Sequence, residues 1–243
     1  MAAIGRLPPA ALALGVAGLL GYHVLYFYAL QNAPAIEANI INYLWPLLIV
    51  VFSGLLPLSA GGRRLAWWHV AGAGLGFAGA LLALLSPGAS AGTASVGAGH
   101  LAALGAAVRW AAYSVASRLF QDVPSSSVVA SSAVTAIGAL LIHLGVETTR
   151  WPETATQWAV IAAMGIGPVG LAFTLWDNAV KHGDLRLLGV ASYVTPLLST
   201  ALLAALGLGH AGPLLWVAVL LVIAGALLAA RDSIGLSKRE QPG

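Results

Sequence analysis

Residues 39–48 read Asn-Ile-Ile-Asn-Tyr-Leu-Trp-Pro-Leu-Leu, in the middle of an apolar run that extends from about residue 36 to residue 58. Pro46 has no backbone N–H, and its ring pushes away the carbonyl group four residues earlier, that of Asn42. A freed polar group has no partner in lipid, so such a break faces protein or a water-filled cavity. The stretch therefore predicts an interrupted membrane-spanning helix.

A second apolar run, at about residues 185–206, contains a related motif. Its Tyr193-Val-Thr-Pro-Leu-Leu matches Tyr43-Leu-Trp-Pro-Leu-Leu at the Tyr, Pro and both Leu positions. Pro46 and Pro196 are therefore expected to break two helices at equivalent places. Interrupted spans in corresponding positions of two halves are typical of secondary transporters.

The composition indicates a polytopic membrane protein. Apolar residues make up 59% of the 243 residues and charged residues only 8%, unlike a soluble domain of this length. The sequence has no cysteine, which excludes disulfides, thiolate catalysis and cysteine-ligated metals. Basic residues are spread along the chain rather than clustered, so we expect no nucleic-acid partner, and we expect no cofactor and no metal.

Windows of roughly 20 apolar residues are long enough to span a bilayer. They predict eight helices, at about residues 10–30, 36–58, 67–86, 99–119, 126–146, 156–180, 185–206 and 211–230. Met1 to Arg6 is too short and too weakly charged to start a cleaved signal peptide. The spans themselves are therefore expected to direct insertion into the bilayer.

The 11 basic residues are distributed unevenly over the two sides that eight spans would create. Arg150 alone lies on one side and Arg109 lies within a span. The remaining nine fall on the other side: Arg6, Arg63, Arg64, Arg118, Lys181, Arg186, Arg231, Lys238 and Arg239. An excess of Lys and Arg marks the cytoplasmic side, so both termini are expected to be cytoplasmic.

Internal similarity predicts an inverted repeat. Residues 77–83 (Phe-Ala-Gly-Ala-Leu-Leu-Ala) recur as residues 223–229 with only the first residue changed. The two copies are displaced by five helices. Because five is an odd number, equivalent helices cross the membrane in opposite directions, so the two copies lie upside down relative to each other. We predict the last three helices of a first repeat in 1–86, a flexible connector in 87–98, a five-helix second repeat in 99–231 and a cytoplasmic tail in 232–243. Two opening helices of the first repeat are then missing, whether removed or never present.

Three segments together resemble the drug/metabolite transporter superfamily, within it the EamA-like proteins and most closely bacterial amino-acid exporters of the YddG type. These are Ala35 to Pro46, Trp110-Ala-Ala-Tyr113 and Ser192 to Ser199. The resemblance implies ten helices in two inverted five-helix repeats, a basket-shaped central cavity and export of aromatic and other amino acids. This chain departs from it by lacking two helices and by having Arg109 before the Trp-Ala-Ala-Tyr motif.

Several side chains are candidates for binding a substrate. Asn39, Asn42, Tyr43 and Pro46 fall on one helix face at i, i+3, i+4 and i+7, which predicts a polar stripe facing the bundle interior; hydrogen bonding between helices is the alternative. Aromatic residues expected at middle depth could line a cavity for an amino acid or simply pack: Tyr22, Tyr26, Tyr43, Trp45 and Trp110. His23 is expected to be a hydrogen-bonded interior histidine rather than a proton relay.

In the seventh span, Ser192 and Tyr193 are further binding candidates, with packing between helices as the alternative. Two glycine series are expected to let helices approach closely: Gly15, Gly18 and Gly21, and Gly72, Gly76 and Gly79. Arg109 needs water or a partner within the membrane, and Asp177 is one candidate.

The favoured function is export of amino acids, aromatic or otherwise apolar, across the bacterial inner membrane by alternating access around a midplane cavity. The alternatives are export of another small metabolite or drug, and a non-transporting membrane scaffold. An intramembrane protease would need a Gly-x-Ser-Gly-type nucleophile site or a His-Glu-x-x-His metal site. The sequence has neither, so no enzyme activity is expected. The partners are a small-molecule substrate and the lipid bilayer, and the oligomeric state stays open.

Overall fold

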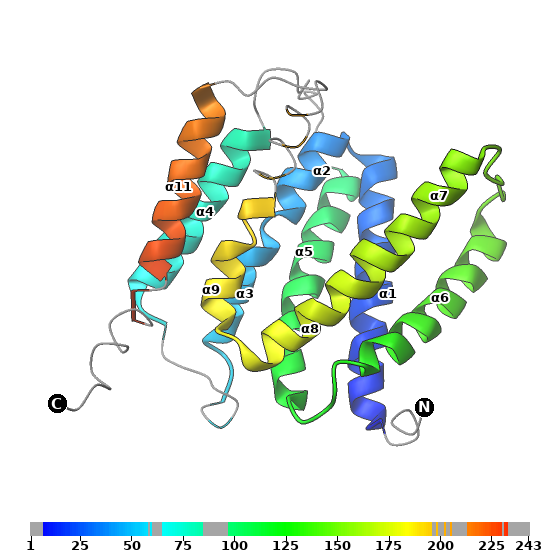
Figure 1. The fold of residues 1–243 in the computed structure, drawn as a ribbon, viewed down its shortest axis with the longest axis horizontal. Helices are drawn as coiled ribbons and strands as arrows, with labels where there is room; N and C mark the ends of the chain where they lie inside the picture. The colour runs from blue at the N-terminus through cyan, green and yellow to red at the C-terminus, as the bar shows by residue number, and fades with distance from the viewer. Residues whose placement is uncertain are drawn as a thin grey trace.

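The computed structural model of the chain describes residues 7–57, 59, 65–84, 97–195, 198, 202, 205, 213–229 and 231–232. All regular secondary structure in these ranges is helical, which confirms the all-helical prediction. In chain order the helices are α1 (Pro9–Asn32), α2 (Ala35–Asn42), α3 (Trp45–Ser53), α4 (Trp67–Leu84), α5 (Ala98–Ser117), the short 3-10 helix η3 (Arg118–Phe120), α6 (Ser127–Val146), α7 (Ala155–Met164), the π-helical η4 (Gly165–Leu171), α8 (Ala172–His182), α9 (Leu185–Ala191) and α11 (Pro213–Ala229) (Figure 1).

The helix boundaries follow local sequence signals. Proline stands at or just before the first residue of α1 and of α2, where its missing N–H costs no helical hydrogen bond. Thr154 caps α7 in a reciprocal box with Gln157, whose side chain in turn accepts from the Thr154 N–H. The Asp184 carboxylate caps α9 by accepting the N–H groups of Arg186 and Leu187.

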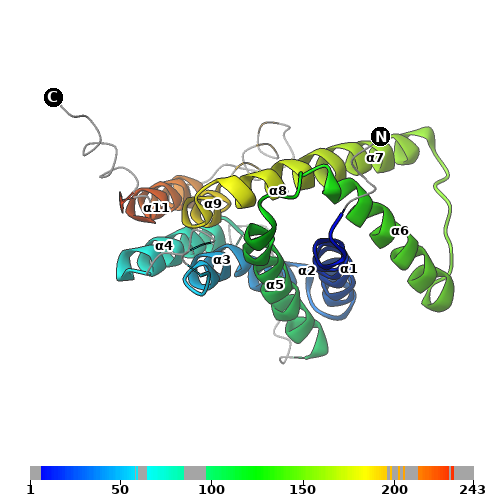
Figure 2. The same cartoon turned by 90° about the horizontal axis from the view of Figure 1, so that it is seen from below.

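The longest continuous helical path is α7, η4 and α8. Sequence analysis predicts this span as one uninterrupted helix, but residues 165–171 are π-helical around Pro168. A proline inside a helix removes a backbone donor, and a π turn accommodates the loss by adding a residue to the turn. The segment runs obliquely past α5 and α1 (Figure 1), and the view from below shows it along one side of these two helices (Figure 2).

In the described parts of the chain, three helices are individually long and apolar enough to cross a membrane: α1, α6 and the path from Ala155 to His182. The other predicted spans also coincide with helical residues in the described parts of the chain. The structure therefore agrees with a multi-pass membrane protein, while the number of eight crossings stays a prediction. Exposed leucine, isoleucine and valine side chains are frequent on α6 and α7, as expected for surfaces that face lipid.

α4 and α11 lie side by side over their whole length (Figure 1) and pack through glycine. A Cβ atom at Gly72 would overlap the Gly225 carbonyl, and one at Gly225 would overlap the Gly72 carbonyl. Farther along the pair, Gly79 meets the backbone of Ala218. Residue numbers rise along α4 while those of the contacting residues fall along α11, so the two helices are antiparallel. Glycine has no side chain, which lets the two backbones touch.

The other glycine series lies on α1 and faces α5 and α6. Cβ atoms at Gly15, Gly18 and Gly21 would overlap the side chains of Ser131, Tyr113 and Arg109, respectively. The prediction that both glycine series are close-approach surfaces is confirmed. Because α1 has no side chain at these places, the side chains of Tyr113 and Arg109 of α5 lie directly against its backbone.

Candidate functional site

The helix break predicted from Pro46 is present, between α2 and α3. α2 ends at Asn42 and α3 begins at Trp45, with Tyr43 and Leu44 in the turn between them. In an unbroken helix the Leu47 N–H would bond to the carbonyl of Tyr43, but here it donates to the hydroxyl of Tyr193 over 3.1 Å. A side chain from the other interrupted span thus satisfies a backbone group of the first break.

The second interruption lies at the equivalent place. α9 ends at Ala191, and Ser192 and Tyr193 form a turn held by short-range bonds from Tyr193 N–H to Val190 and from Thr195 N–H to Ser192. Pro196 itself lies outside the described residues. The described part therefore shows that the helix is interrupted, but not the contribution of Pro196.

An aromatic cluster packs beside the first break. We use this term for Tyr22, His23 and Tyr26 of α1, Trp45 of α3, Trp110 and Tyr113 of α5, and Phe173 and Trp176 of α8. Trp110 is at its centre, with ring centroids 5.1 Å from Tyr22 and 5.4 Å from Phe173. The Trp45 ring meets the Trp176 ring edge to face, 5.4 Å away at 89°. Such pairs are preferred by aromatic quadrupoles and present π faces from four helices.

Polar atoms are interleaved with these rings. The side-chain amide of Asn42 donates through Nδ2 to the Tyr22 hydroxyl over 3.2 Å. The Tyr26 hydroxyl donates to the side-chain oxygen Oδ1 of Asn39 over 2.5 Å. Asn42 is only 5% exposed, and its Oδ1 atom has no hydrogen-bond partner in the described part of the chain. A buried acceptor without a partner is costly, so this oxygen is suited to receive a donor from a bound molecule.

His23 extends the same set of groups. Its Nδ1 lies 2.7 Å from the Leu19 carbonyl oxygen, which can only accept, so Nδ1 carries the proton. In the neutral ring Nε2 is then an acceptor. The His23 ring contacts Tyr22 and Phe173. The prediction of a hydrogen-bonded interior histidine agrees with this geometry.

The structure brings together six of the predicted site residues, namely Tyr22, His23, Tyr26, Asn42, Trp45 and Trp110. Tyr43 is half-buried in the turn between α2 and α3, next to Asn42. Ser192 and Tyr193 lie elsewhere. The Ser192 hydroxyl donates to its own helix at Leu188, and the fully buried Tyr193 packs against Phe77 of α4.

Sequence analysis misses Phe173 and Trp176 of α8 and assigns no role to Tyr113. Trp176 stacks on Trp110 with centroids 6.3 Å apart, and its indole N–H donates to the Ser114 hydroxyl over 3.0 Å. A signal for α8 was present in the sequence. Pro168, with glycines at 165, 167 and 170, marks a distorted turn immediately before these aromatic residues.

The expected pairing of Arg109 with Asp177 is wrong. The Arg109 Nε atom donates to the Ala17 carbonyl oxygen over 2.9 Å, and Asp177 forms an ion pair with Lys181, one helical turn farther on, at 2.6 Å. Residues at i and i+4 are neighbours on a helix surface, whereas Arg109 and Asp177 would have to bridge a difference in depth. The carbonyl contact to α1 stabilises the guanidinium without a carboxylate.

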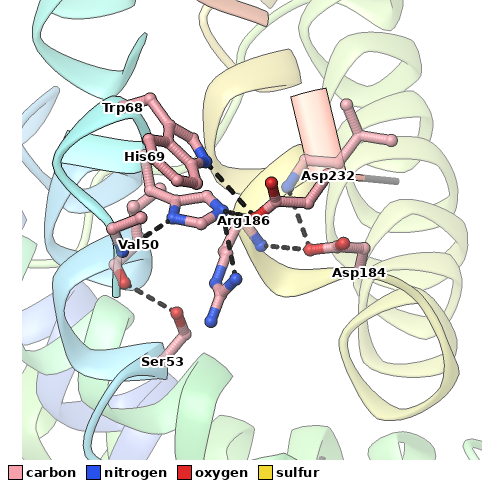
Figure 3. Close-up of polar contacts among 9 residues, drawn as sticks. Val50, Ser53, Trp68, His69, Asp184, Arg186 and Asp232 are labelled. Atoms are coloured by element: carbon pink, nitrogen blue, oxygen red, sulfur yellow. Dashed lines mark hydrogen bonds and ion pairs between the residues drawn. The ribbon is translucent and has the colours of Figure 1, made fainter. Parts of the chain in front are cut away.

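A second polar cluster joins the neighbouring ends of α4, α9 and α11 (Figure 3). The buried His69 accepts the Ala66 N–H at Nδ1 over 3.1 Å, and its Nε2 lies 3.4 Å from Asp232 Oδ2. The Trp68 indole N–H also donates to Asp232 Oδ2, over 3.3 Å. Arg186 approaches His69 Nε2 to 3.0 Å. These contacts fasten three helix ends together. Within the described ranges no three His, Asp or Glu residues could hold a metal ion.

Comparison with known proteins gives consistent results. The EamA-like transporter family matches residues 3–85 and 97–231. An aromatic amino acid exporter YddG from Ancylobacter novellus is 46% identical over 219 residues, covering 88% of this chain and 74% of the relative. The protein of that name from Escherichia coli is 30% identical over 213 residues, covering 83% and 69%. A solved crystal structure of a protein with 44% identity superposes with a TM-score of 0.86, covering 93% of this chain and 79% of that one.

Proposed function

Because the chain belongs to the EamA-like transporter family, we propose that it exports amino acids with aromatic or other apolar side chains, and that the aromatic cluster binds them. Family membership confirms the prediction of a multi-pass membrane transporter rather than an enzyme. The relatives named as aromatic amino acid exporters support the substrate class. We further propose that the chain resides in the bacterial inner membrane with both termini in the cytoplasm, as the distribution of basic residues favours.

The observation that carries this proposal is the combination of π faces with unused acceptors beside the first helix break. The half-buried rings of Trp45 and Trp176, held in place by the buried Trp110, offer faces on which an aromatic or aliphatic side chain can pack. The partnerless Asn42 Oδ1 and the His23 Nε2 lone pair can accept N–H groups of a substrate ammonium. An ammonium group is also attracted to the face of an indole ring. The cluster therefore matches both ends of an apolar amino acid.

The helix boundaries support the inverted repeat within residues 1–86 and 99–231. The Tyr43 and Tyr193 motifs align α2 with α9, which begin at Ala35 and Leu185, respectively. The same alignment places the end of α1 at Asn32 opposite the end of α8 at His182. The cluster thus draws aromatic side chains from α1 and from its counterpart α8. Rocking of such repeats about a central site gives alternating access, which we propose as the transport mechanism.

The glycine contacts between α4 and α11 support the same symmetry. The repeated heptapeptides align Gly79 with Gly225 and Gly72 with Ala218. Gly79 packs on Ala218, and Gly225 packs on Gly72, so each contact is the counterpart of the other. Reciprocal contacts of this kind arise when two equivalent helices meet across a twofold axis.

Counterflow into proteoliposomes tests the proposal. Purified protein is reconstituted into vesicles preloaded with unlabelled phenylalanine, and uptake of radiolabelled phenylalanine is followed. We expect saturable uptake that tryptophan and leucine compete for and that glutamate leaves unchanged. Absence of exchange for every amino acid, with correctly inserted protein, would contradict the substrate assignment. It would favour another metabolite or a non-transporting role.

A further inference from the structure

The most unusual buried group outside the aromatic cluster is an ion pair within an apolar helix. Lys181 and Asp177 lie near the C-terminal end of the apolar path from Ala155 to His182. Their side chains are 3% and 5% exposed, and Lys181 Nζ lies 2.6 Å from Asp177 Oδ2. Charged side chains within a membrane span are costly and typically mark an ion or proton pathway. A merely structural contact could be made by uncharged residues.

The pair borders a small polar cavity between α1, α5, α6 and α8. The cavity has a volume of about 20 Å³, and its lining includes Asp177, Lys181, Tyr113, Ser117 and Ser131. That volume holds one water molecule, and hydroxyl groups are the partners that such a water needs. A water molecule in this cavity would lie beside the Asp177 carboxylate and could hand a proton to it.

The groups around Asp177 leave Lys181 as its charged partner in the described part of the chain. Lys181 also donates to the Val123 carbonyl over 2.9 Å. Arg118 of η3 also lies at this end of α8, but it donates to the carbonyls of Val180 and Gly183. Tyr113 is the titratable residue that α5 contributes to the cavity, and the lining residues of α1 and α6 are uncharged. The charge of this site is therefore controlled by one carboxylate and one ammonium group.

The cavity and the aromatic cluster share Tyr113 and are adjacent along α8. Trp176, the residue immediately before Asp177, packs on Trp45 and Trp110. Tyr113 lines the cavity and also contacts Trp110, with ring centroids 5.6 Å apart. A movement of α8 that changes the position of Trp176 must also move the adjacent carboxylate. Occupancy of the cluster and the state of the ion pair are thus mechanically connected.

We propose that Asp177 is a proton-binding site that couples export of the substrate to entry of protons, an inference that rests on the proposed function. One proton adds to the Asp177 carboxylate and removes its charge, so the buried ammonium group of Lys181 loses its counter-ion and the contacts of this end of α8 with α5 and α6 rearrange. Loss of the same proton on the other side of the membrane restores the ion pair. One proton enters and leaves per cycle, and no other reactant is needed.

Accumulation driven by a pH gradient tests the proposal separately from counterflow. Vesicles that are acidic inside receive radiolabelled phenylalanine outside, so an antiporter accumulates label as protons leave. We expect wild-type protein to accumulate label above the equilibrium level. D177N should lose this accumulation but retain counterflow, because exchange of substrate needs no net proton movement. D122N, which alters the exposed carboxylate of Asp122, is the control and should behave as wild type.

The outcomes separate the two proposals. Failure of wild-type counterflow would contradict the proposed function, whereas wild-type counterflow without gradient-driven accumulation would overturn the coupling alone. Accumulation by D177N at the wild-type level would also overturn it. If D177N does not fold, D177N/K181Q removes both charges together. It should then retain counterflow but lose the accumulation driven by the pH gradient, and accumulation at the wild-type level would contradict the assignment.

Discussion

The α4–α11 pair and the aromatic cluster are both interior contacts between helices, but they are built from opposite kinds of side chain. In the pair, glycine and alanine let two backbones touch, and no polar side chain intervenes between Gly72 and Gly225. In the cluster, large rings keep four helices apart, and Asn42 Oδ1 is buried without a described partner. Small residues produce a rigid contact, whereas large amphipathic rings leave groups that a ligand can use.

The two kinds of contact should behave differently when the protein changes conformation. If the repeats rock about the cluster, the glycine-packed pair, which joins one repeat to the other, should stay in contact while the aromatic contacts rearrange. Substitutions in the two regions are therefore expected to have different consequences. Changes in the pair should affect folding, and changes in the cluster should affect binding and transport.

The largest effect is expected for Gly225→Leu. A side chain there would overlap the backbone of Gly72, which cannot move aside without separating α4 from α11. We expect loss of the monodisperse peak in size-exclusion chromatography in detergent. Gly74→Leu is the matched control, because a Cβ atom at Gly74 meets nothing within 4 Å. A well-folded Gly225→Leu protein would show that the pair is not a rigid contact.

Trp45→Ala is expected to have the next largest effect, on transport rather than on folding. The half-buried Trp45 ring forms edge-to-face contacts with Trp110 and Trp176. Its removal should lower counterflow of phenylalanine by more than about tenfold, since burial of an apolar side chain against an indole is worth more than about 1.4 kcal/mol. Trp151→Ala, which alters an exposed ring, should retain wild-type flux. Equal flux in the two variants would remove Trp45 from the site.

Asn42→Ala tests whether Asn42 binds the ammonium group of the substrate. It removes the buried Oδ1 acceptor and the donor to Tyr22. A hydrogen bond to a charged group is worth about 1.5–3 kcal/mol, so the KM for phenylalanine should rise roughly 10- to 100-fold. Phenylpropionate, which lacks the ammonium group, should compete equally with wild type and variant. If its competition falls as much as that of phenylalanine, Asn42 does not bind the ammonium.

The smallest effect is expected for Tyr193→Phe, which removes the acceptor of the Leu47 N–H. An unsatisfied buried donor costs about 1–3 kcal/mol, so the thermal midpoint in detergent should fall while flux per folded molecule stays near wild type. Tyr28→Phe, at an exposed position, is the control for loss of a hydroxyl. A large loss of flux at an unchanged midpoint would instead place Tyr193 in the binding site.

Structural features that depend on residues close together in the sequence could be predicted from the sequence. The break between α2 and α3 follows from Pro46, and close approach follows from glycines at helical spacing. The contacts between helices that are far apart in the sequence could not be predicted, because the packing of α8 against α5 depends on the π turn at residues 165–171. The same limit applies to Arg109, for which Asp177 was one candidate partner: Asp177 instead pairs with Lys181, its neighbour at i+4 on α8.

Equilibrium binding tests the central claim most directly, because it requires no transport cycle. Binding of tritiated phenylalanine to purified protein is measured by scintillation proximity, with unlabelled tryptophan as competitor. We predict saturable, competed binding to wild type and its loss in a Trp45→Ala/Asn42→Ala double variant whose elution profile is unchanged. Equal binding to both proteins would contradict the claim that the aromatic cluster beside the α2–α3 break is the substrate site.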